Sequence, residues 1–210
     1  MTTQRTRTVR MPREQRRRQL LAVALQTFSE QGYHRASMDD IAESAGVSKP
    51  VLYQHFPGKH ELYLALVEHS LADLAGDLLA ALRDAAPREG ITLNRARVEE
   101  MLRVYFDFVE HQPQAHRLIF ESDLMADEQV QRRFEAFHTG IAEAVGEVLG
   151  RSTGIGREHA VMLSRALTGM VQIGAGHWAR HPEQGTREEA QRQMFRLAWG
   201  GISVLDEDWA

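Results

Sequence analysis

One short segment of the chain gathers side chains of very different chemistry onto a single outer surface. Residues 48–56 read SKPVLYQHF, and Leu52 and Phe56, four positions apart, share one side of a helix. The other side combines a cation, a phenol, an amide, an imidazole and small apolar groups: Lys49, Pro50, Val51, Tyr53, Gln54 and His55. Such groups can pair with base edges and phosphate oxygens in a DNA groove. The segment is therefore a candidate DNA-reading surface.

The residues around this segment predict the elements that must position it. Ser37 is a good N-cap for a helix whose apolar residues recur at i, i+3, i+4 and i+7: Met38, Ile41, Ala42 and Ala45. Gly46 allows the left-handed backbone that ends this helix. Ser48 then caps the next helix, and Pro50 stands in its first turn, where a missing N–H costs nothing. Two short helices and a tight turn indicate a helix-turn-helix. A generic hairpin buried in a bundle is the alternative, but it would not present three polar side chains on one short outer face.

The segment GVSKPVLYQHFPGKHELY resembles the recognition helix of the TetR family of transcriptional regulators and the start of the long helix that follows it. The upstream RRRQLLAVALQTFSEQGYHRASMDDIAESA is similar to the first two helices of that family. The resemblance implies a homodimeric, DNA-binding transcription regulator with an N-terminal three-helix head and a C-terminal helical body. Double-stranded operator DNA and a small lipophilic effector are the implied partners.

The resemblance also assigns roles to side chains, since phosphate contacts position a protein and base contacts specify the sequence that it reads. It implies that phosphates are contacted by Ser37, Tyr53 and Lys59. It implies that base edges are met by Lys49, Pro50, Val51 and Gln54. His55 could do either.

Composition sets the class of protein. The chain has 210 residues, 43% hydrophobic and 26% charged, which is typical of a soluble globular protein with one domain or two small ones. It has no cysteine, so disulfides, thiolate metal sites and thiol redox sensing are excluded. The longest purely apolar run, residues 20–25, is too short to span a bilayer. We expect a cytoplasmic protein without a membrane partner.

The net charge of −4 hides an uneven distribution. Residues 1–60 hold ten Lys or Arg against five Asp or Glu, whereas residues 61–210 hold fifteen against twenty-four. A basic head that meets phosphate and an acidic body that does not would give this distribution. We expect three parts: a basic flexible arm over 1–12, a helix-turn-helix DNA-binding domain over 13–58, and a ligand-binding and dimerisation domain over 59–210.

The N-terminal arm and the start of the first helix carry seven arginines between residues 5 and 18, opposed only by Glu14. We interpret this run as an arm that adds phosphate or minor-groove contacts beside the head. A tail without a role and an organellar transit peptide are the alternatives. The transit peptide is disfavoured because the run continues without a break into the first helix.

Apolar periodicity and its breaks predict an all-α fold of about nine helices. Gly32 ends the first helix, Pro57-Gly58 precedes the long fourth helix, and Asp127 begins the seventh. The clearest expected spans are 13–31, 59–85, 157–180 and 186–204. No alternating apolar pattern predicts a strand.

The last two helices are unusually rich in small residues. Glycine costs about 1 kcal/mol in a helix interior relative to alanine, so several glycines indicate that backbones approach closely there. One helix-turn-helix reads only half a site, which favours a two-fold dimer. We expect its interface to include Ala166, Met170, Ile173, Met194, Leu197, Gly201 and Ile202. The alternative is that these helices simply cover their own core. The TetR resemblance implies the dimer.

Apolar faces on four body helices are sufficient to enclose a ligand, although such faces are more often plain core. The family resemblance favours a ligand site, and the expected lining is Leu74, Leu78, Leu82, Leu102, Tyr105, Val109, Val145 and Met170. Within the family, YFDFVEHQPQAHRLIFESDL and RLAWGGIS resemble the fatty-acid-synthesis regulators of actinobacteria. That narrower resemblance implies control of lipid-synthesis genes and a long-chain acyl-CoA effector, whose binding would change the angle of the fourth helix.

Other chemistry is poorly supported. His177 and His181 have the i, i+4 spacing of a metal site, and His111 and His116 flank a proline. Pro182 disfavours helical geometry at His181, and no thiolate or acidic cluster accompanies the pair. We expect no metal and no cofactor. The chain has no Gly-x-Ser-x-Gly sequence and no glycine-rich phosphate loop after a strand, so we expect no enzyme.

Two further functions stay open at this point. One is a TetR-type repressor of an efflux or degradation operon that senses an unrelated lipophile. The other is a small-molecule-binding or structural helical protein that never meets DNA.

Overall fold

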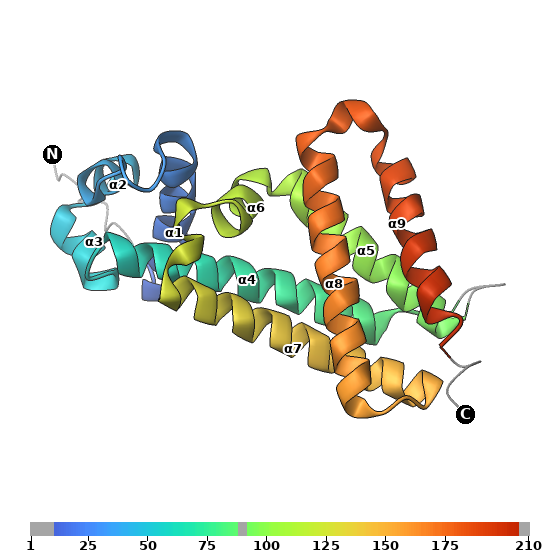
Figure 1. Cartoon of the computed structure of the whole chain (residues 1–210). Helices are drawn as coiled ribbons and strands as arrows, with labels where there is room; N and C mark the ends of the chain where they lie inside the picture. Colours follow the sequence, from blue (N-terminus) through green and yellow to red (C-terminus); the bar gives the residue numbers. More distant parts are fainter. Residues whose placement is uncertain (1–10, 88–91, 206–210) are drawn as a thin grey trace, which may run out of the picture. The chain divides into compact units, whose positions relative to one another are not determined.

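The computed structural model describes residues 11–87 and 92–205. Within these residues the chain consists of α-helices and two short 3-10 helices, without a strand, which confirms the expected all-α fold (Figure 1). The chain forms two compact units, Met1–Leu66 and Val67–Ala210. The predicted arm over 1–12 lies outside the described residues except for its last two positions.

The first unit contains α1 (Arg13–Gln31), α2 (Met38–Ser44), α3 (Lys49–His55) and the first turns of α4 (Lys59–Asp84). Gly32 ends α1 with φ 80°, and Gly46 follows α2 with φ 62°, both in the left-handed region that favours glycine. The Ser37 hydroxyl accepts from the Asp40 N–H, and the Asp40 carboxylate accepts from the Ser37 N–H, which is a capping box.

Ser48 only partly meets its prediction. It occupies the N-cap position of α3 with extended backbone, but its side chain makes no capping hydrogen bond. Pro50 in the first turn is confirmed. The start of α3 is therefore defined by proline geometry more than by a serine cap.

The second unit contains the rest of α4 and the helices that follow it. They are α5 (Leu93–His111), α6 (Pro113–Phe120), η1 (Asp123–Ala126), α7 (Glu128–Thr153), α8 (Arg157–Arg180), η2 (Pro182–Gln184) and α9 (Arg187–Ile202). Asp127 caps α7 by accepting from the N–H groups of Gln129 and Val130. Gly154, with φ 77°, ends α7 in the left-handed region.

Helix α8 is held tightly against both of its neighbours. A Cβ on Gly146 of α7 would lie 3.1 Å from the backbone of Val161, so a larger residue there would push α7 and α8 apart. Helices α8 and α9 run in opposite directions and are joined through η2 (Figure 1). Gly174 of α8 makes room for the Met194 side chain of α9, because a Cβ would lie 2.6 Å from its methyl carbon.

Among the residues described, no helix is both long enough and apolar enough to cross a membrane.

Charged residues recur along the outer faces of the long helices. An example is α7, where the Glu128–Arg132 pair, four positions apart, lies 2.7 Å apart at the surface.

Candidate functional site

The predicted reading surface of α3 faces outward. Leu52 and Phe56 are buried in the first unit, with exposed fractions of 0% and 1%. Tyr53 is 48% exposed. Among the other five predicted residues, the exposed ones are Lys49, Pro50 and Gln54. The half-buried ones are Val51 and His55. The structure thus brings all six to one outer surface, while their division between bases and phosphates stays a prediction.

Two groups on this surface have partners that affect their charge. The Lys49 ammonium lies 2.7 Å from the Asp39 carboxylate, and this hydrogen bond raises the pKa of Lys49. Both side chains are well exposed, so the pair is weak and Lys49 can exchange Asp39 for another acceptor. Burial, together with the nearby Arg13 and Arg17, lowers the pKa of His55. His55 is therefore neutral at pH 7 and offers one donor and one acceptor.

Helix α1 holds the end of the reading helix. The Arg17 guanidinium makes a long hydrogen bond of 3.5 Å to the His55 carbonyl, and it lies 4.5 Å from the centre of the Phe56 ring. A cation at this position complements the negative C-terminal end of α3. Arg17 therefore helps to position α3.

Lys59 has an environment that the sequence does not reveal. Its ammonium donates to the carbonyls of Tyr33 (2.8 Å), His34 (3.2 Å) and Ala36 (3.0 Å), all in the connection between α1 and α2. It also lies 4.6 Å from the centre of the Tyr33 ring. Because an ammonium has three donors, all of them are used within the first unit. The implied phosphate contact stays a prediction, and it would require Lys59 to give up one of these bonds.

We expect Lys59→Met to loosen the α1–α2 connection. The variant keeps most of the aliphatic stem but leaves three carbonyls to water, a loss of about 1–3 kcal/mol in local stability. Hydrogen–deuterium exchange of the amides of residues 33–37 should accelerate roughly tenfold or more. The matched control is Lys49→Met, which loses only an exposed ion pair. Equal exchange in the two variants would show that the three carbonyl bonds contribute little.

The second unit contains an apolar cavity of about 80 Å³ between α4, α5, α7, α8 and α9. A second cavity of about 60 Å³ adjoins it. The two share five wall residues: Val98, Met101, Val145, Leu167 and Ile202. The two cavities are therefore neighbours that share part of their walls.

Five of the eight residues predicted to line a ligand site line one of these two cavities, and the binding of a ligand there stays a prediction. Leu78, Leu102 and Tyr105 line the first cavity, Leu82 lines the second, and Val145 lines both. The remaining three line neither cavity. Leu74 and Val109 are core residues, with exposed fractions of 2% and 1%, and Met170 is half-buried.

The structure adds wall residues that sequence reasoning missed. On α5, Val98 and Met101 precede Leu102 and Tyr105 on the same helical stripe, so periodicity could have found them. Three polar wall residues gave no such signal: His138, Thr168 and Gln172.

The residues predicted for the dimer interface fall into two groups. Ile173 and Leu197 are 72% and 63% exposed, and Ala166 and Gly201 are also exposed. Met194 instead packs on Gly174, and Ile202 lines both cavities, so these two side chains serve their own chain. Met170 is half-buried. Met162 of α8 and Val204, which follows the end of α9, are also exposed apolar residues, at 58% and 52%.

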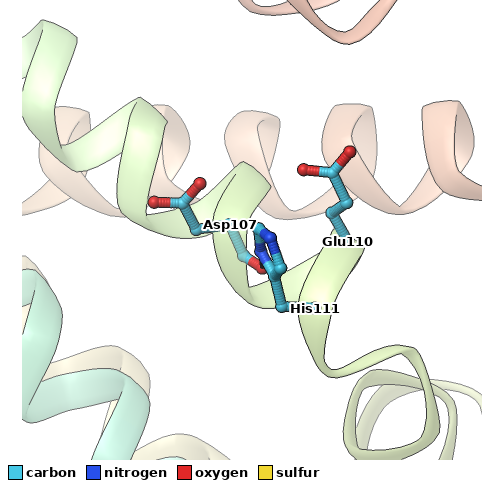
Figure 2. A group of neighbouring side chains, drawn as sticks. All are labelled: Asp107, Glu110 and His111. Atoms are coloured by element: carbon cyan, nitrogen blue, oxygen red, sulfur yellow. Dashed lines mark hydrogen bonds between the residues drawn. The ribbon is translucent and has the colours of Figure 1, made fainter.

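An acidic cluster on α5 is the one group of possible metal ligands found among the described residues. Figure 2 shows Asp107, Glu110 and His111 there, with ligand atoms within 4.8 Å of one another. The Arg187 guanidinium of α9 pairs with both carboxylates, at 2.7 Å from Glu110, and Arg103 also pairs with Asp107. These arginines neutralise the carboxylates, and the network fastens the start of α9 to α5.

His177 and His181, which have the spacing of a metal site, lie at the end of α8. The ring of His177 is 3.2 Å from the Gln184 amide oxygen, and that of His181 is 3.4 Å from the Glu183 carboxylate. The two rings lie 4.6 Å apart. His116 differs, because it is buried against Gly176 and between the rings of Phe108 and Phe120.

Comparison with known proteins gives consistent matches. Residues 20–66 match the family described as bacterial regulatory proteins, tetR family. The chain is 38% identical over 194 residues to the HTH-type transcriptional activator FasR of Mycolicibacterium smegmatis, covering 92% of this chain and 86% of that protein.

Solved structures agree in fold. A TetR-like transcriptional regulator from Rhodococcus sp. RHA1 has a TM-score of 0.69 and 25% identity, covering 92% of this chain and 99% of the other. The regulator FadR from Bacillus subtilis, solved in complex with stearoyl-CoA, has a TM-score of 0.64 at 12% identity, covering 92% of this chain and 99% of the other.

Proposed function

Because the chain belongs to the tetR family of bacterial regulatory proteins, and is thus a DNA-binding transcriptional regulator rather than an enzyme, we propose that it controls lipid-synthesis genes in response to a long-chain acyl-CoA or a similar lipophile. The observation that carries this proposal is the pair of adjoining apolar cavities in the second unit. Similarity to FasR along most of the chain supports it. The stearoyl-CoA complex of FadR supports it at the level of the fold alone.

Helix α4 gives the proposed route from effector to DNA. Its residues Leu78 and Leu82 belong to the cavity walls, and its first residue, Lys59, hydrogen-bonds the connection between α1 and α2. An effector that widens the cavities would change the angle of α4. In a dimer the two reading helices must meet half-sites about 34–36 Å apart, so a small pivot is enough to spoil the fit.

A homodimer is part of the proposal. One protomer offers one reading helix. Ile173 on α8 and Leu197 on α9 give it an apolar surface that is exposed in the part of the chain that the structure describes. We propose that a second copy covers this surface around a two-fold axis. The regulator would act in the cytoplasm, where its operator lies.

A second candidate function is favoured by the size of the cavities. Volumes of about 80 and 60 Å³ accept a compact lipophile without expansion, whereas a long acyl chain requires the two to join. The alternative is therefore a TetR-type repressor of an efflux or degradation operon that senses a compact, unrelated lipophile.

Purified protein and fragmented genomic DNA would test the proposal. We expect the protein to select a discrete operator, with an affinity that falls steeply as salt rises. Palmitoyl-CoA should change that affinity at least tenfold, whereas coenzyme A alone should not. Native mass spectrometry of the purified protein should show a co-purified acyl species. A response to compact lipophiles and none to palmitoyl-CoA would favour the alternative, and retention on DNA that ignores both salt and sequence would contradict DNA reading altogether.

A further inference from the structure

The Tyr105 side chain holds a polar atom that the protein itself leaves unused. Tyr105 lies on α5, is 4% exposed and belongs to the wall of the 80 Å³ cavity. Its hydroxyl is fully buried and has no hydrogen-bond partner among the described residues. A buried hydroxyl without a partner destabilises a folded protein, and phenylalanine would fill the same space without that cost. A hydroxyl in an apolar wall therefore indicates a partner that arrives from outside the chain.

The chemistry around Tyr105 restricts what that partner is. Burial raises the pKa of Tyr105 far above its ordinary value, so its hydroxyl stays protonated and can donate. Burial, and secondarily the charge of Arg165, lowers the pKa of His138, so its ring is neutral at pH 7. Thr168 already donates its hydroxyl hydrogen to the Ser164 carbonyl at 2.9 Å. Of the described residues in this wall, none carries a charge at neutral pH.

We propose that the Tyr105 hydroxyl donates a hydrogen bond to the carbonyl oxygen of an uncharged acyl group, such as a thioester, and so selects acyl derivatives over free fatty acids. The inference rests on the proposed lipophilic effector and adds the group by which that effector is recognised. A carboxylate beside Tyr105 would be buried without a cation, which is strongly unfavourable. An acyl carbonyl accepts the hydrogen bond without bringing a charge.

The second cavity offers room for the acyl chain, and its wall contains an arginine that could attract a carboxylate. Its wall includes Arg97, whose guanidinium donates to the Leu82 carbonyl at 3.0 Å and to the Asn94 side chain at 2.9 Å. Arg97 is thus already engaged, but a free fatty acid lying in the opposite direction would bring its carboxylate near this side chain. A free acid is therefore one arm of the experiment.

Three probes of equal chain length separate these possibilities in the full-length protein without DNA. They are the dodecanoyl thioester of N-acetylcysteamine, the matching dodecyl thioether without a carbonyl, and dodecanoate. Trp199, in the wall of the second cavity, provides a fluorescence signal for binding. We expect the wild type to bind the thioester about tenfold more tightly than the thioether, and to bind dodecanoate no better than the thioether.

The variant Tyr105→Phe should bind thioester and thioether alike, with an unchanged or raised melting temperature. The matched control is Thr168→Val, which removes the other hydroxyl of this wall and should keep the tenfold preference. A wild type without preference, a Tyr105→Phe protein that keeps it, or dodecanoate binding as tightly as the thioester would each overturn the inference. If no probe binds, both this inference and the proposal of a lipophilic effector are wrong. If the preference is found but palmitoyl-CoA leaves DNA affinity unchanged, only the proposed function fails.

Discussion

Replacing Leu197 by Asp should convert the protein into a monomer that no longer retains its operator. Leu197 lies on α9 and is 63% exposed in one chain, so a carboxylate costs the isolated protomer little. In a dimer built on α8 and α9, the same carboxylate would be buried without a partner in both copies, at several kcal/mol each. With about 1.4 kcal/mol for each factor of ten, the dimerisation constant should weaken by about 10³-fold or more.

Light scattering coupled to size-exclusion chromatography measures the oligomer, and fluorescence anisotropy measures binding to the selected operator. A monomer has one reading helix and loses the second half-site, so operator affinity should fall at least a hundredfold. Leu93→Asp is the matched control. Leu93 is 37% exposed at the first position of α5, where an acidic residue suits the helix N-terminus. A Leu197→Asp protein that stays dimeric would move the interface away from α9.

Replacing Val145 by Phe should leave DNA binding intact while abolishing the response to effector. Val145 lines both cavities, so the larger ring has space and would occupy the place of an acyl chain. Burying the ring should leave stability unchanged or raise it by about 1 kcal/mol. Operator affinity should equal that of the wild type, and palmitoyl-CoA should no longer change it.

Val130→Phe is the control for this substitution, because it is the same change on the same helix at a filled position. Val130 is 0% exposed and lines neither cavity, so overpacking should cost about 1–3 kcal/mol, measured by thermal unfolding. Equal destabilisation of the two variants, with a preserved response in Val145→Phe, would place the effector elsewhere.

Much of the fold could be predicted because local signals determine it. The span of α1 and its end at Gly32 follow from an apolar stripe and one residue that tolerates positive φ. The capping box at Ser37 and the N-cap at Asp127 are also local, since each involves residues within three positions. The six side chains on the outer face of α3 follow from helical periodicity once Leu52 and Phe56 are placed inward.

The candidate effector site could be predicted only in part, because an apolar stripe does not show whether it faces a cavity or a filled core. Leu78 and Leu74 occupy the same stripe of α4, yet only Leu78 lines a cavity. Whether a leucine of this stripe lines a cavity depends on the spacing of the five helices around it. The packing of side chains from distant segments decides that spacing. The contacts of Lys59 could not be predicted either, because its partners are backbone carbonyls more than twenty residues earlier in the chain. Every residue type has such a carbonyl, so the sequence does not mark the ones that Lys59 contacts.

Helix α8 has one side in a cavity wall and the other toward solvent. Thr168, Val171 and Gln172 line the 80 Å³ cavity, whereas Ile173, the next residue, is 72% exposed on the proposed contact between copies. Thermodynamic reciprocity then couples the two events: an effector that alters self-association by some factor has its own affinity altered by that factor. The effective concentration at which the regulator switches would consequently shift with its copy number in the cell, so that gene dosage becomes part of the response.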